Sequence, residues 1–123
     1  MNWTATAAVA LALAVTLGAF GAHGLRDRLD AYALSVYERA VFYHFVHALG
    51  LLAVPLLARV NAISGAAAAR VCWLLLAGIV LFSGSLYVLA VTGIRALGVV
   101  TPFGGVSFIA AWVVLAFAAL KRK

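Results

Sequence analysis

The sequence predicts an all-α membrane protein: a four-helix transmembrane bundle with one amphipathic helix at the interface. Of its 123 residues, 67% are hydrophobic and only 10% are charged, and the mean hydropathy is +1.17. A soluble domain is about 45–50% apolar and about 25% charged, so this chain must place much of its surface in lipid. A membrane-spanning helix needs about 20 apolar residues. Four such helices and their connections fill the chain as a single domain.

Four apolar segments are long enough to cross the hydrocarbon layer. They lie at residues 2–22, 41–58, 71–91 and 102–120. Residues 26–40 are the most polar part of the chain, and their apolar positions recur at helical spacing. That pattern predicts an amphipathic helix lying along the membrane surface. Thr101 and Pro102 mark the start of the last span, with the threonine as N-cap and the proline at the first helical position.

The charges indicate membrane topology and not nucleic-acid binding. Nine Lys and Arg against three Asp and Glu give a formal charge of +6, but the basic residues mostly stand singly at the ends of apolar runs. Four spans put both termini on one side of the membrane, with five basic residues there and four on the other side. The positive-inside rule then places both termini in the cytoplasm. Anionic lipid headgroups are the expected contacts of the basic residues.

Small residues form a stripe along the first span. They recur every fourth residue, as Thr6, Ala10, Ala14, Gly18 and Ala22. Small faces let helix backbones approach closely, and van der Waals packing drives helix association in lipid. We expect this face to meet another helix, in the same chain or in a second copy, unless it only reflects an alanine-rich composition. Gly84 in the third span and Gly104 with Gly105 in the fourth predict further close contacts.

His44 and His47 are three residues apart, so they share one face of a helix. An ionisable group within a membrane is costly and is a functional candidate by default. A metal or haem site would need more ligands, and only His23 and Glu38 could supply them. One alternative is that the histidines handle a proton or a ligand. The sequence favours the other, in which they serve polar packing or contact lipid headgroups. We therefore predict no metal and no cofactor.

Few other polar side chains accompany these histidines. The candidate polar or ligand site consists of His23, Glu38, His44, His47, Ser83, Ser85, Tyr87, Arg95 and Thr101. Hydroxyl groups in lipid commonly bond to their own helix or to a neighbouring one, and we expect Glu38 to meet Arg95 or His23. The sequence holds no Ser-His-Asp order, nucleotide-binding loop, cysteine pair or zinc-protease motif. These observations predict a protein that is not an enzyme.

Four blocks of the sequence together resemble domain-of-unknown-function family 423, the YgdD-like small bacterial inner-membrane proteins. The blocks are GAFGAHGL at 18–25, YHFVHALGLL at 43–52, LFSGSLYVLAVTG at 81–93 and TPFGGVSFIAAW at 101–112. The resemblance spans most of the chain and implies a four-span protein of the inner membrane, in a family without an established activity. It also implies that certain residues stand at signature positions, namely His23, His47, Ser83, Gly84, Ser85, Tyr87, Thr101 and Pro102. From the resemblance we expect the family to have glutamine where His44 stands, in which case the histidine pair is not the family's shared chemistry.

Two functional hypotheses follow. The first is a non-enzymatic membrane protein that packs with itself, lipid or a membrane-protein partner, whose polar side chains should bond helix to helix. The alternative is a carrier of a small molecule or ion, with a polar site between spans two and three. A carrier should direct His47, Ser83, Ser85 and Tyr87 toward one shared space. A metal or haem protein would instead have His44 and His47 converge on one ion.

Overall fold

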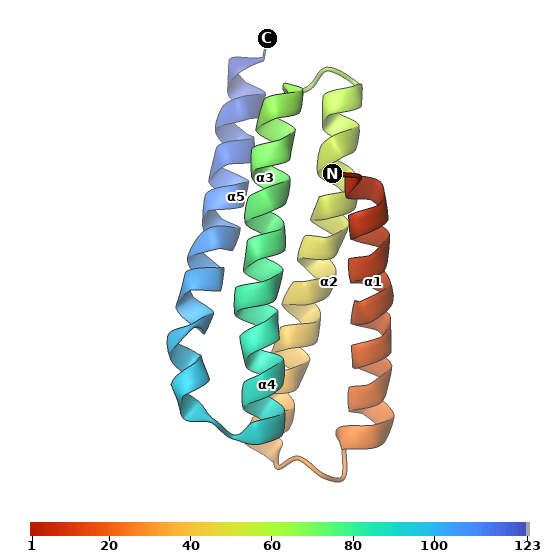
Figure 1. Cartoon of the computed structure of the whole chain (residues 1–123), viewed down its shortest axis with the longest axis vertical. Coiled ribbons are helices and arrows are strands. Elements are labelled where there is room, and N and C mark those ends of the chain that lie inside the picture. Colours follow the sequence, from red (N-terminus) through yellow and green to blue (C-terminus); the bar gives the residue numbers. More distant parts are fainter. Residues whose placement is uncertain (123) are drawn as a thin grey trace.

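The computed structural model describes residues 1–122, and within them the chain is helical almost throughout (Figure 1). Four helical segments are long and apolar enough to cross a membrane: Trp3–Leu25, Ala31–Arg59, Gly65–Thr92 and Arg95–Lys121. The predicted all-α, four-span membrane fold is therefore confirmed.

Two of the four spans contain a short π-helical stretch. The first span is α1 (Trp3–Phe20) followed by the π-helix η1 (Gly21–Leu25), and the second is α2 (Ala31–Arg59). The third is α3 (Gly65–Gly78), the π-helix η2 (Ile79–Gly84) and α4 (Ser85–Thr92). The fourth begins with the 3₁₀ turn η3 (Arg95–Val99) and continues as α5 (Thr101–Lys121).

Side-chain caps set the starts of the first three spans. Asn2, Asp30 and Ser64 each accept a hydrogen bond from the backbone N–H three residues later, at 3.0, 2.7 and 3.1 Å. Each bond satisfies one of the amide groups that a helix leaves free at its N-terminus. The third span ends at Gly93, whose φ of 72° is the left-handed conformation that glycine adopts without strain.

The predicted surface helix over residues 26–40 does not form as a separate element. Residues 26–30 connect the first two spans, and α2 then runs unbroken from Ala31 to Arg59. Its 29 residues give a length of about 43 Å, whereas the hydrocarbon layer is about 30 Å thick. The amphipathic pattern of residues 31–40 therefore belongs to the turns of α2 that extend beyond the hydrocarbon.

Thr101 is not the N-cap of the last span. The η3 turn leads directly into α5, so the backbone is already helical at Val100 (φ −76°, ψ −36°) and Pro102 is the second helical residue. The Thr101 hydroxyl is thereby free to bond to the third span.

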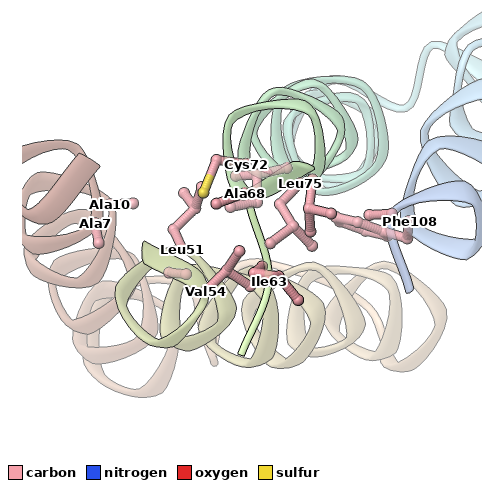
Figure 2. Packing of buried hydrophobic residues seen from close by; sticks show 13 residues of the cluster. Ala7, Ala10, Leu51, Val54, Ile63, Ala68, Cys72, Leu75 and Phe108 are labelled. Carbon is pink, nitrogen blue, oxygen red and sulfur yellow. The ribbon is translucent and has the colours of Figure 1, made fainter. Parts of the chain in front are cut away.

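The spans pack as a series of neighbours. The α2 helix lies between α1 and α3, and α3 lies between α2 and α5. Figure 2, which looks along the bundle, shows α1 and α5 on opposite flanks of the central pair. Both termini and the 60–64 connection lie toward one end of the bundle (Figure 1).

Apolar side chains fill the contact between the central helices. Leu51 and Val54 of α2 meet Leu75 of α3, with Ile63 from the connection and Phe108 from α5 completing this cluster (Figure 2). A second cluster lies toward the other end and includes Val36, Ala40, Leu86 and Ala90. The lone cysteine, Cys72, is fully buried in the first cluster.

The small-residue face of α1 contacts α2 for part of its length. Ala10 and Ala14 are buried, and a methyl group placed at Gly18 would lie 3.3 Å from Val41. Ala22 is exposed, because a four-residue repeat exceeds the helical repeat of 3.6 and drifts by about 40° at each step. Gly21 is buried in its place.

The closest approach of two spans occurs at Gly104. A methyl group added there would lie 2.7 Å from the Cα atom of Phe82 in η2, and closer still to its backbone nitrogen. At Gly84 an added methyl group would meet only the carbonyl of Ile79, at 3.9 Å. The predicted tight contact in this region therefore depends on Gly104 rather than on Gly84.

Candidate functional site

His44 lies where three spans meet. Its Nδ1 atom lies 2.8 Å from the hydroxyl of Tyr87 in α4, and the side chain lines a groove together with Ala10 of α1. The side chain is only 4% exposed. A buried imidazole with a partner on a neighbouring helix stabilises packing, because hydrogen bonding replaces the water that lipid cannot supply.

His47 faces a different neighbour. Its Nδ1 donates to the carbonyl of Tyr43 at 2.7 Å, within its own helix. The ring stacks on Phe108 of α5, with centroids 3.5 Å apart and planes at 13°, and Trp112 lies beyond it at 5.7 Å. The two histidines therefore do not converge, and within residues 1–122 no group of three or more His, Cys, Asp or Glu could hold a metal ion.

Three hydrogen bonds made by serine hydroxyl groups join spans to one another. Ser83 donates to the carbonyl of Ala40 in α2 at 2.8 Å. The hydroxyl oxygens of Ser85 and Thr101 lie 2.6 Å apart, and their hydrogen bond links α4 to α5. Ser107 donates from α5 to the carbonyl of Leu74 in α3, also at 2.6 Å. These bonds run in different directions, so the candidate residues of span three face no common space.

Tyr37 is a contact residue that the candidate site did not include. Its hydroxyl donates to the carbonyl of Leu17 in α1 at 2.5 Å, and its ring meets that of Tyr87 edge-on, with centroids 5.3 Å apart. A methyl group at Gly21 would lie 2.8 Å from Cδ1 of the Tyr37 ring and closer still to Cε1, so the glycine is needed for this contact. The sequence signal was the seven-residue spacing from Tyr37 to His44, which puts both on one helix face.

The charged candidates lie at the surface. His23, Glu38 and Arg95 are all exposed. Glu38 lines a hollow of about 190 Å³ beside Gly18 and Gly21, whereas Arg95 lines another with Asp30. The structure thus places Glu38 and Arg95 in separate hollows, contrary to one of the two expected pairings, and the pairing of Glu38 with His23 stays a prediction.

A groove of about 600 Å³ lies between α1 and the third span. Its walls are mainly apolar, with Val9, Leu13 and Leu17 on one side and Leu76 and Ile79 on the other. Of the candidate polar residues, His44 and Tyr87 border it, together with the helix-packing candidate Gly84. Ser83, Ser85 and His47 do not.

A further hollow, of about 450 Å³, lies where α3 begins and α5 ends. Arg70, Lys121 and Arg122 line it together with Ser64 and apolar side chains. The sequence analysis treated these basic residues as topology signals and as contacts of anionic lipid headgroups. Their position on two adjacent helices could not be read from a charge count. Lys123, the last of the basic cluster, lies outside the described residues.

Comparison with known proteins finds clear relatives. A family described as "Protein of unknown function (DUF423)" matches residues 17–105. The UPF0382 membrane protein YwdK of Bacillus subtilis (strain 168) is 52% identical over 110 residues, which cover 89% of this chain and 88% of the relative. The UPF0382 membrane protein SSP2132 of Staphylococcus saprophyticus is 50% identical over 109 residues, covering 89% and 88% of the two chains. No solved structure matches the chain.

Proposed function

The chain belongs to the DUF423 family of unknown function, and we propose that it is a non-enzymatic membrane protein that acts through contacts within the bilayer. Those contacts are with further copies of itself, with lipid or with a membrane-protein partner. The relatives carry membrane-protein names and come from bacteria. Four apolar spans make this chain a multi-pass membrane protein.

One observation carries the proposal: most of the buried polar side chains are engaged in hydrogen bonds that join spans, and His47 bonds within its own helix. Ser83, Ser85 and Tyr87 bond to α2, α5 and His44 respectively. Within the described residues, no buried side-chain nitrogen or oxygen lacks a hydrogen-bond partner. A catalytic or transport site needs polar groups that are free to meet a substrate. This pattern supports a role in packing.

The groove between α1 and the third span is the feature that favours the alternative, a small-molecule carrier. It has room for a ligand and borders His44 and Tyr87. These two groups are already bonded to each other, and the rest of the groove wall is mainly apolar. A polar substrate or ion would therefore meet few available partners there, whereas lipid chains match the walls.

We further propose that the protein resides in the bacterial inner membrane with both termini in the cytoplasm. The support is the charge distribution, because the end with both termini carries five basic residues against four at the other end. All three acidic residues, Asp27, Asp30 and Glu38, belong to the other end.

Native mass spectrometry of the gently extracted protein tests the proposed function. We expect a monomer or oligomer that carries only phospholipid or a second protein chain. A stoichiometric small molecule of defined mass would contradict the packing role and support the carrier. Uptake of that same molecule by vesicles containing the purified protein, but not by empty vesicles, would establish transport.

A further inference from the structure

We propose that the hollow between α3 and α5 binds the phosphate headgroup of an anionic phospholipid. This basic pocket lies at the end of the bundle that carries both termini, and its volume is about 450 Å³. Arg70 of α3 lines it together with Lys121 and Arg122 from the end of α5. The proposal rests on the proposed function, since it names the class of lipid with which the protein makes contact.

The charge of the pocket matches an anionic ligand. Three of its eight lining residues are cationic and none is acidic. The three acidic residues of the chain all lie within positions 27–38, which belong to the opposite end of the bundle. Basic pockets between membrane helices recognise anionic headgroups, and each Lys or Arg near the surface adds attraction to such lipids.

Arg70 provides the most directional contact. Its Nε atom donates to the carbonyl of Ala66 at 3.4 Å, which directs the side chain along the first turns of α3. The two terminal amino groups of the guanidinium are thereby left for a ligand. A planar guanidinium donates two parallel hydrogen bonds to a phosphate, a geometry that lysine cannot reproduce.

The shape of the pocket favours a lipid over a free phosphate ion. Apolar side chains continue from its charged rim toward the hydrocarbon, namely Ala67, Val114, Phe117 and Ala118. From Lys121 to Val114 the helix descends about 10 Å. Phe117 is 60% exposed. A phospholipid would place its phosphate at the rim and an acyl chain along this wall, whereas an inorganic ion would leave the wall uncovered.

The test measures lipid binding to the full-length protein after delipidation in a neutral detergent. Phosphatidylglycerol and phosphatidylcholine of equal chain length are titrated in parallel and followed by native mass spectrometry. Arg70→Gln is compared with Arg59→Gln, which removes the same charge at the same end of the bundle but outside the pocket. Circular dichroism first establishes that both variants keep the wild-type helix content.

We expect the wild-type protein to bind phosphatidylglycerol in preference to phosphatidylcholine. One pocket charge contributes about a fivefold change in affinity, so Arg70→Gln should weaken phosphatidylglycerol binding about fivefold and Arg59→Gln should leave it nearly unchanged. Removing all three pocket charges, in R70Q/K121Q/R122Q, should weaken it about a hundredfold. Arg70→Lys keeps the charge and should lose less than Arg70→Gln.

Three results would overturn the proposal. Equal losses in Arg70→Gln and Arg59→Gln would mean a diffuse surface charge instead of a site. Unchanged binding in the triple variant would place the lipid elsewhere. Displacement of the lipid by inorganic phosphate at a matching concentration would identify a free-anion site. None of these results bears on whether the protein is a carrier, so the proposed function is tested separately from the lipid site.

Discussion

Replacing Gly104 by alanine tests the tightest contact between two spans. The added methyl group would lie 2.7 Å from the Cα atom of Phe82, whereas ordinary contacts of this kind begin near 3.4 Å. The two backbones must therefore separate by about 0.7 Å or more. Neither backbone can shift locally, because Phe82 lies within the hydrogen-bonded π-helix η2 and Gly104 lies within α5.

The expected loss of stability is about 2–4 kcal/mol. Forcing an extra methyl group into a packed contact costs about 1–3 kcal/mol. Separation of the spans would also weaken the bonds of Ser85 to Thr101 and of Ser107 to Leu74, and each such bond contributes about 0.6 kcal/mol in membrane proteins.

Gly105→Ala is the matched control. A methyl group there would lie 3.8 Å from the Phe82 side chain, an ordinary contact. Both variants gain the same intrinsic helix propensity from the change, so their difference isolates the contact with η2. Unfolding by titration with a denaturing detergent, followed by circular dichroism, gives the two free energies. Equal stabilities, or a less stable Gly105→Ala, would refute the structural reasoning.

Three further predictions concern polar groups and topology. Ser83→Ala should lower the free energy of unfolding by about 0.6 kcal/mol in the same assay. Ser35→Ala loses only an exposed hydrogen bond to its own helix and should lower it less. Equal losses of stability would contradict the role of Ser83 between spans. His44→Gln should stay folded with a similar melting temperature, because glutamine can also accept a hydrogen bond from the tyrosine hydroxyl; a collapse of expression or melting temperature would disprove this. A cysteine added after Lys123, with the native thiol removed by Cys72→Ala, should be protected from membrane-impermeant reagents in intact cells; labelling there would reverse the proposed orientation.

The number and approximate position of the spans could be predicted from hydropathy alone, because lipid imposes a minimum helix length. The residues at which the helices start were harder to predict from the sequence. Asp30 lies in the segment taken for a surface helix, and only the structure identifies it as the cap of α2. The four-residue stripe of α1 was informative at Ala10 and Ala14 and misleading at Ala22, because a small drift accumulates along a helix.

The site was harder to predict, since a sequence gives the face of a helix but not its neighbour. The spacing of His44 and His47 placed them near each other on α2, yet the structure directs one toward Tyr87 and the other toward Phe108. The two π-helical stretches had no clear signal beyond nearby glycines. The basic pocket was missed because Arg70 and Lys121 are 51 positions apart in the chain.

The alanine face of α1 has a consequence for the entropy of assembly. Ordering an alanine or glycine side chain costs essentially no rotamer entropy, whereas a leucine or isoleucine costs about 0.5–1 kcal/mol. The first helix meets α2 mainly through Ala7, Ala10 and Ala14, while the central contact must immobilise Leu51 and Leu75. These three alanines therefore join the bundle with almost no loss of side-chain freedom, and only a few larger side chains of α1, such as Leu11 and Leu17, are packed beside them. Modest dispersion forces along the length of α1 are then enough to hold it in place.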